Sequence, residues 1–228
     1  MTGLVRTAAI VACLGALAAS IAAAGVPSPS NSIKPSFIAT VGSNPGNATP
    51  NKGDPSGTFT VVVHDVGNFP IPNSQVIVDL GACSDAKLCT SVAPGQTADC
   101  PTKTVRGFTD GTGSISFTVI GAGTNSGGSP GPGAGCANIT ADGVSLIHPT
   151  NVVYDQNGAA AIPVPGMEVT DLSKFLVDLG TGFYFGRSDY SALDGVDQGV
   201  ISVIDLSKFL VRLGTGQSAN PCSVAICP

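Results

Sequence analysis

The 228-residue sequence contains no tryptophan, and aromatic residues make up only 5% of it, so its core must be built mainly from aliphatic side chains. It has only two histidines, His64 and His148. Neither has a recognisable catalytic companion, and both are expected at the surface or at a strand edge. The G-x-S-x-G, H-E-x-x-H and phosphate-loop motifs are also absent. The sequence therefore predicts a protein that is not an enzyme.

Positive charge is scarce as well. The chain has ten Lys and Arg residues against fifteen Asp and Glu residues, which gives a formal net charge of −5. One of the ten, Arg6, falls in the N-terminal segment described next, so nine basic residues remain against fifteen acidic ones, a charge of −6. Such an acidic chain is not expected to bind nucleic acid, because the phosphate backbone attracts Lys and Arg.

Long hydrophobic runs are missing except near the N-terminus. Residues 1–24 combine one Arg, an apolar run broken by small residues, and Ala-x-Ala before Gly25. This pattern predicts a secretory signal that is cleaved, which places the mature protein outside the cell or at the cell surface. A retained membrane anchor is the alternative. No other segment approaches the length of a membrane span, so we expect none after cleavage.

Six cysteines remain after cleavage, since Cys13 leaves with the signal. An even number in an exported chain favours disulfides over metal thiolates, although zinc is an alternative. Closeness in sequence and the position of a glycine-rich loop predict three pairs, but six cysteines allow fifteen arrangements. The predicted pairs are Cys83–Cys89, Cys100–Cys136 and Cys222–Cys227.

Between a leader that composition predicts to be flexible (residues 25–35) and residue 153, short alternating runs are separated by Gly, Pro, Asn and Asp. In SISFTVI (114–120), for example, residues 115, 117 and 119 are apolar, whereas residues 114, 116 and 118 are polar. This alternation is typical of a strand packed on one side. Such strands without intervening helices favour a two-sheet sandwich over a parallel sheet. The predicted strands are Phe37–Val41, Thr58–His64, Gln75–Leu80, Thr102–Phe108, Ser114–Ile120, Cys136–Thr140 and Val144–Val153, the last interrupted by Pro149.

Two segments of this region carry a resemblance to a known family. GTFTVVVHDVGNFPIPNSQVIVDL (57–80) has a strand, a proline-containing turn and a second strand, and TDGTGSISFTV (109–119) has a glycine turn that leads into a strand. Residues 36–153 thereby resemble secreted bacterial immunoglobulin-like domains of the invasin and intimin type. The resemblance implies an immunoglobulin-like β-sandwich. The inter-sheet disulfide and stacked tryptophan of antibody domains are missing, so the likeness to those is architectural.

The C-terminal part contains a tandem duplication. DLSKFLVDLGTG begins at Asp171, and DLSKFLVRLGTG begins 34 residues later at Asp205; the two match at 11 of 12 positions. Their apolar residues recur at helical spacing, and a glycine closes each helix. We therefore expect two amphipathic helices that pack against each other. The apolar positions are Leu172, Phe175, Leu176 and Leu179 in copy one, and Leu206, Phe209, Leu210 and Leu213 in copy two.

Each helix is preceded by an acid at the same distance: Asp155 lies 16 residues before Asp171, and Asp189 lies 16 before Asp205. With the DLSKFL words, this order is similar to dockerin modules, which are paired, EF-hand-like calcium loops and helices that dock onto cohesin domains. Over residues 155–216 the resemblance implies bound Ca²⁺. It departs from the family because the outer acids are 16 rather than 11 residues apart and Val196 occupies a ligand position. The implied ligands are Asp155, Asn157 and Asp171 in copy one, and Asp189, Ser191, Asp194 and Asp205 in copy two.

The alternative for these acids is that they cap helices or are solvated loop residues. By the same resemblance, the residues that contact a partner protein are Ser173, Lys174, Ser207 and Lys208, whereas on the alternative view they are ordinary exposed helix residues.

The sequence thus predicts a mainly β, secreted, non-catalytic protein for binding or anchoring. A sandwich (36–153) would act as a spacer or in cell adhesion, and a dockerin-like module (154–218) would dock to a cohesin-like partner. A cysteine-containing tail (219–228) follows this module. The alternative is an accessory subunit of an extracellular carbohydrate-degrading system, or a cryptic extracellular hydrolase.

Overall fold

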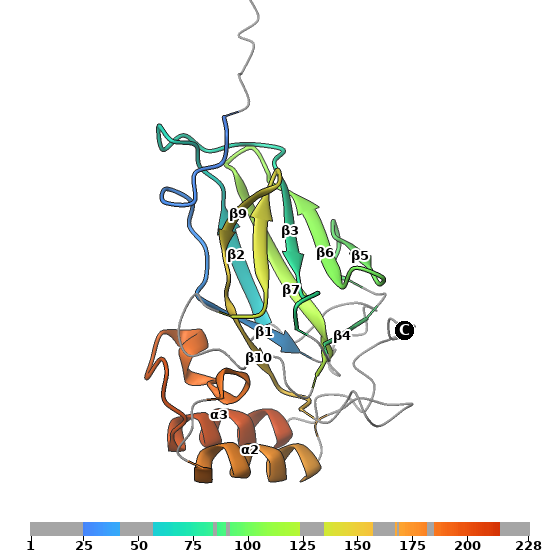
Figure 1. Cartoon of the computed structure of the whole chain (residues 1–228), viewed down its shortest axis with the longest axis vertical. Helices are drawn as coiled ribbons and strands as arrows, with labels where there is room; N and C mark the ends of the chain where they lie inside the picture. Colours follow the sequence, from blue (N-terminus) through green and yellow to red (C-terminus); the bar gives the residue numbers. More distant parts are fainter. Residues whose placement is uncertain are drawn as a thin grey trace, which may run out of the picture.

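Two packed β-sheets with two helices beneath one end make up the computed structural model (Figure 1). The structure describes residues 25–41, 57–83, 86–89, 92–123, 135–156, 167, 169–181 and 185–214. The predicted signal (1–24) and tail (219–228) lie outside these residues. The strands are β1 (Phe37–Val41), β2 (Thr58–Val62), β3 (Gln75–Asp79), β4 (Lys87–Leu88), β5 (Thr97–Asp99), β6 (Thr104–Phe108), β7 (Ser114–Ala122), β8 (Asn138–Ala141), β9 (Val144–Ile147) and β10 (Thr150–Val153). The helices are α2 (Val169–Thr181) and α3 (Val203–Gly214), with short 3₁₀ turns η3 (Gly186–Ser188) and η4 (Ser191–Asp194) between them.

The first sheet has the order β10-β1-β7-β2, with β4 paired to β7, and the second has the order β5-β6-β3-β8-β9. Strand β1 is parallel to both of its neighbours, β10 and β7. The other named pairs are antiparallel. The inner faces of both sheets bury aliphatic side chains against each other, as expected for a sandwich. Phe59 and Phe117 add a stacked pair with ring centroids 5.8 Å apart.

Strand β1 is buried on both faces, which explains why its sequence FIATV is apolar except for Thr40, whose hydroxyl donates to Asn151. Ile38 points into the core between the sheets. Phe37, Ala39 and Val41 point to the opposite face, where they pack with residues of the two helices in a second hydrophobic cluster. The helices therefore share a core with the outer face of the first sheet.

The predicted strands are present with small shifts at their ends. Pro149 divides the last predicted strand into β9 and β10, as expected for a residue that cannot donate to a ladder. In β7 the alternating pattern holds for Phe117 and Val119, which are in the core, but Thr118 and Ile120 on the other face are buried too. The C-terminal half of β7 is therefore covered on both sides, which its sequence did not indicate. The short strands β4 and β5 were not predicted because they are too brief to show a period.

Residues 25–35, which composition predicted to be a flexible leader, lie along the sandwich instead. Ile33 exchanges two backbone hydrogen bonds with Val62, and the backbone N–H of Ser28 donates to His64. The Asn31 side chain donates to the carbonyl groups of Asp65 and Val66. The segment pairs with the chain that follows β2, so its backbone groups are satisfied despite the Pro and Ser residues.

Both predicted helices form, and Phe175 and Phe209 stack between them with ring centroids 5.3 Å apart. Leu176 and Leu210 were expected in the buried stripe, but they are 47% and 44% exposed and lie on the outer side. The buried stripe is narrower than predicted because each helix contacts the sandwich mainly through its Phe residue. Within the described residues, no helix is both long and apolar enough to cross a membrane.

The disulfide pairing differs from the prediction. Cys83 is bonded to Cys136, 53 residues away, so both Cys83–Cys89 and Cys100–Cys136 are wrong. Cys89 and Cys100 are disulfide-bonded as well. The prediction relied on nearness in sequence, but tertiary contacts decide the pairing. Because β3 and β8 pair antiparallel, the residues just after β3 lie beside those just before β8. The pair Cys222–Cys227 falls outside the described residues.

Candidate functional site

Tyr190 is the centre of the joint between the helices and the sandwich. It is fully buried, and its ring stacks on Tyr154 at 4.6 Å and contacts Phe175 and Phe209 at 5.7 and 5.6 Å. Its hydroxyl donates to the carbonyl of Val153 at the end of β10, 2.9 Å away. Burial raises the pKa of Tyr190 well above its ordinary value, because a phenolate here would lose its hydration.

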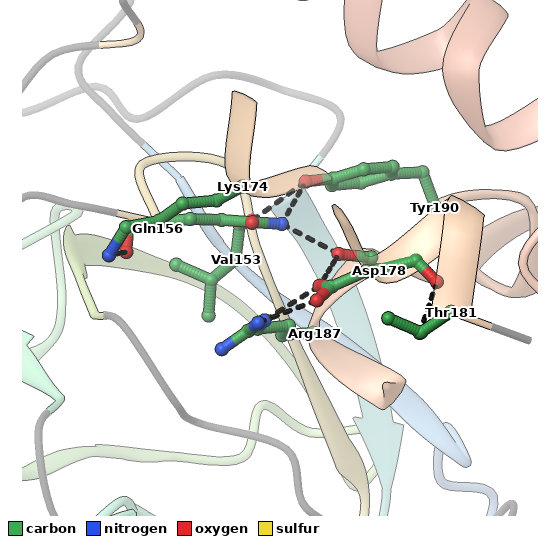
Figure 2. Close-up of polar contacts among 8 residues, drawn as sticks. Val153, Gln156, Lys174, Asp178, Thr181, Arg187 and Tyr190 are labelled. Atoms are coloured by element: carbon green, nitrogen blue, oxygen red, sulfur yellow. Dashed lines mark hydrogen bonds and ion pairs between the residues drawn. The ribbon is translucent and has the colours of Figure 1, made fainter. Parts of the chain in front are cut away.

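A chain of polar contacts runs from Tyr190 into helix α2 (Figure 2). Gln156 Nε2 donates to the Tyr190 hydroxyl at 2.9 Å and to Ser188 Oγ at 2.8 Å. Ser188 in turn donates to Asp178 Oδ2 at 2.6 Å. Arg187 completes the network with two hydrogen bonds to the same carboxylate, 2.6 Å from Nη2 and 2.8 Å from Nε. These contacts fix the end of β10, α2 and η3 relative to one another.

The copy-two loop, from Asp189 to Asp205, is closed by hydrogen bonds from backbone N–H groups to the two acids at its ends. Asp189 Oδ2 accepts from Gly199, 2.8 Å away and near the end of the loop. Asp205 Oδ1 accepts from Ser191, 2.7 Å away and near its start. Each acid thus holds the part of the loop that is farther from it in sequence. This arrangement gives the 16-residue spacing a structural role in copy two.

Asp205 also belongs to a capping box at the start of α3. The Ser202 hydroxyl accepts from the N–H of Ile204 at 3.1 Å, and Asp205 Oδ2 accepts from the N–H of Ser202 at 2.7 Å. Asp205 is therefore a capping residue, as the alternative to metal binding predicted. It is fully buried rather than solvated.

In copy two, each of the four carboxylate oxygens of Asp189 and Asp205 accepts a backbone N–H group, with Asp189 Oδ1 accepting from Ala192 at 3.1 Å. Calcium takes six to eight oxygen ligands, and the structure brings together only part of such a set, so calcium binding by copy two stays a prediction. The Ser191 hydroxyl lies beside Asp189, but Asp194 faces away and pairs with Lys208. Among the described residues, no group of three or more His, Cys, Asp or Glu side chains is placed to hold a metal.

In copy one, Asp155 and Asp171 are 3% and 0% exposed. Asn157, the third implied ligand, falls outside the described residues. Calcium binding by copy one therefore stays a prediction.

Each of the two helices carries a row of exposed apolar residues. In α2 this row is Val169, Leu176 and Val177, whose spacing of seven and eight residues places them on one side of the helix. The duplicated residues of α3 lie at the same positions. The exposed fractions match in pairs: 72% for both Val169 and Val203, 47% for Leu176 and 44% for Leu210, and 61% for Val177 and 58% for Val211.

The four predicted partner-contact residues divide into two kinds. Ser173 and Ser207 are exposed within the apolar rows. Lys174 and Lys208 are partly buried and turn toward their own chain: Lys174 Nζ donates to the Gln156 carbonyl at 3.2 Å, and Lys208 pairs with Asp194. A pocket of about 290 Å³ beside α3 is bordered by this ion pair and by Ser207.

Sequence reasoning missed both the polar network and the outward position of Leu176 and Leu210. One signal for the network was present, because position 178 is the single mismatch between the two twelve-residue words, with Asp178 in copy one and Arg212 in copy two. No comparable signal marked the exposed leucines, since their spacing fits the buried stripe. The two histidines belong to the sandwich; His64 contacts the leader through Nδ1, 3.0 Å from the Asn31 carbonyl oxygen.

No family model, no curated protein and no solved structure matches the chain.

Proposed function

We propose that this is a secreted, non-catalytic binding or anchoring protein, and that the outer face of the α2–α3 pair binds a protein partner. The observation that carries the proposal is the double row of exposed apolar residues, defined here as the docking face: Val169, Ser173, Leu176, Val177, Val203, Ser207, Leu210 and Val211. Large apolar side chains that gather on one surface are typical of interaction sites.

The charges on the two helices leave the docking face largely apolar. All three of their acids, Asp171, Asp178 and Asp205, are buried. Of their partly exposed cations, Lys174 donates to the Gln156 carbonyl and Lys208 pairs with Asp194. The complementary partner is a protein with an apolar patch of its own.

The resemblance of residues 155–216 to dockerins makes a cohesin-like domain the proposed partner. The closed copy-two loop supports a helix pair that is held in place by its own hydrogen bonds, so docking in this proposal does not require calcium there. The sandwich, which we propose to be immunoglobulin-like, would act as a spacer or adhesive. The Cys83–Cys136 disulfide supports an oxidising, extracellular location.

The experiment is surface plasmon resonance with the chain from Gly25 onward and a panel of purified cohesin domains. We expect binding by the wild-type chain and at least a tenfold loss of affinity in the Leu176→Asp/Leu210→Asp variant, because the new carboxylates would be buried in the apolar interface without a partner. The control is Phe69→Asp, which changes an exposed apolar residue in the β2–β3 loop, away from the helices (Figure 1).

Circular dichroism melting must show that the variants remain folded. Unchanged affinity in the double variant would show that the docking face is wrong. Absence of wild-type binding to the whole panel would overturn the cohesin-like partner. Sedimentation velocity tests whether the docking face binds a second copy of the chain. A dimer that the double variant abolishes would show that it does, instead of binding a cohesin-like partner.

A further inference from the structure

Gly25, the residue directly after the predicted signal, lies against the side chain of Asp65. A Cβ atom added to Gly25 would be 2.6 Å from Asp65 Cβ and 2.8 Å from Asp65 Oδ2. Real Cβ contacts are not this short, so a larger residue at position 25 would displace the Asp65 side chain or the leader. The predicted N-terminus of the mature chain therefore lies in close contact with the Asp65 carboxylate.

The Asp65 carboxylate uses one oxygen for its own turn. Oδ1 accepts hydrogen bonds from the backbone N–H groups of Gly67 and Phe69, each 2.9 Å away. Oδ2, the oxygen that faces Gly25, accepts none from the residues that the structure describes. The Lys34 ammonium, the one cation of the leader, donates to the carbonyl groups of Pro29 and Ser32. A cation beside Oδ2 would give this second oxygen a partner.

We infer that cleavage between Ala24 and Gly25 supplies that cation: the new α-ammonium group of Gly25 forms an ion pair with Asp65 Oδ2 and fastens the leader to the sandwich. In the uncleaved chain the nitrogen of Gly25 is a neutral amide tethered to Ala24. Cleavage by a secretory signal peptidase breaks this C–N bond with one water molecule, whose hydroxyl goes to the Ala24 carbonyl and whose hydrogen goes to the Gly25 nitrogen. The amine then takes a proton from solvent.

The geometry allows the pair without moving the rest of the leader. Nitrogen and a Cβ occupy equivalent tetrahedral positions on Cα, at bond lengths of about 1.5 Å. Once the peptide bond to Ala24 is gone, rotation about the Cα–C bond of Gly25 can carry the amine to the position of the added Cβ, which is 2.8 Å from Oδ2. That is the length of a charge-assisted N–H···O bond. The approach to Asp65 Cβ, at 2.6 Å, is shorter than real contacts, so the free terminus and the Asp65 side chain must both adjust for the pair to form.

Contacts of the leader hold the terminus at this place. Ser28 donates to the His64 carbonyl at 2.7 Å, and Asn31 donates to that of Asp65 itself at 2.9 Å. The leader covers the backbone of residues 62–65, which would otherwise be an open edge of the sheet. Removal of the signal would thus strengthen the cover over this edge. The inference depends on cleavage after Ala24 and is independent of the docking face.

The first measurement is the N-terminal residue of the exported protein, determined by intact mass and N-terminal sequencing. Glycine 25 is expected. Any other first residue in the mature chain would overturn the inference.

The second measurement is a cycle of four proteins that all begin at residue 25: wild type and Asp65→Asn, each with a free or an Nα-acetylated terminus. Asn keeps an Oδ1 acceptor for Gly67 and Phe69, so the turn is preserved. Hydrogen exchange of the Ser28 and Ile33 amides reports how often the leader opens. In wild type we expect acetylation to speed this exchange about two- to fivefold, as expected for an exposed ion pair.

In Asp65→Asn, acetylation should leave the exchange rate unchanged, because there is no carboxylate to pair with. Equal effects of acetylation on both backgrounds, or no effect on wild type, would overturn the ion pair. Should Asp65→Asn fail to fold, a wild-type chain with Ala24 retained provides the second comparison. Its amine is displaced by one residue, and its leader should exchange as fast as that of the acetylated wild type; slower exchange would contradict the inference.

Discussion

Asp178 and Arg187 form a bidentate ion pair, with Arg187 Nη2 2.6 Å from Asp178 Oδ1, at the one position where the duplicated helical words differ. Asp178 is 1% exposed and also accepts the Ser188 hydroxyl. Arg212 occupies the equivalent position of copy two. Arg187 thus pairs with the carboxylate of copy one, where copy two has an arginine instead, and this breaks the symmetry of the duplication at this point.

Replacement of Arg187 by Met should destabilise the protein by about 3 kcal/mol, because it leaves the Asp178 carboxylate buried without its cation. Urea unfolding followed by circular dichroism measures this loss. The matched control is Arg106→Met, which should cost less because Arg106 is exposed on β6. Equal losses in the two variants would contradict the assigned role of the ion pair.

Truncation of Phe175 or Phe209 to Ala should cost about 3–5 kcal/mol each, because both rings are fully buried between the helices and the sandwich. Leu176→Ala is the control, and it should cost under about 1 kcal/mol since nearly half of that side chain is already in water. Denaturant unfolding would refute the assignment if the Leu176 variant were as unstable as the Phe175 variant.

Loss of the Cys83–Cys136 disulfide by replacing both residues with Ala should destabilise the chain by about 4 kcal/mol, the loop-closure entropy expected for a cross-link across 53 residues. The pairing itself is checked by peptide mapping under non-reducing conditions. A peptide that links Cys83 to Cys89 would contradict the structure.

Asp110 should titrate below its ordinary value of 3.8, because the Thr112 hydroxyl, 2.6 Å away, and the N–H groups of Ser114 and Thr112 stabilise its carboxylate and so lower its pKa. The folded-state pKa lies below the unfolded one, so this stabilisation is present above pH 3.8 and is lost as the pH falls through the folded-state pKa. Thr112→Val should raise the pKa toward 3.8, measured by NMR titration. Thr97→Val is the control and should leave it unchanged.

Asp205→Asn should destabilise the protein by about 1–2 kcal/mol, because the amide can no longer accept with both oxygens from Ser191 and Ser202. Thermal unfolding in EDTA and in calcium should give the same loss, since the acid closes this loop through hydrogen bonds. A loss that occurs only with calcium present would show that Asp205 is a metal ligand.

Local pattern was enough to predict the longer elements of this fold. The alternation in SISFTVI and the helical spacing of the DLSKFL words reflect the periods of a strand and a helix, which depend on nearby residues alone. Pro149 likewise marked the break between β9 and β10 because it lacks an N–H group. The duplication predicted two equivalent helices, and Asp205 was correctly weighed as a helix cap.

Contacts between distant parts of the chain decided the rest. Cys83 meets Cys136 because β3 pairs with β8, and Leu176 and Leu210 are exposed because Tyr190 and the outer face of β1 leave room for one Phe from each helix. Sequence spacing fixed which residues share a face of an element. Only the tertiary structure determined which face was covered, since burial depends on the surface that another element brings to it.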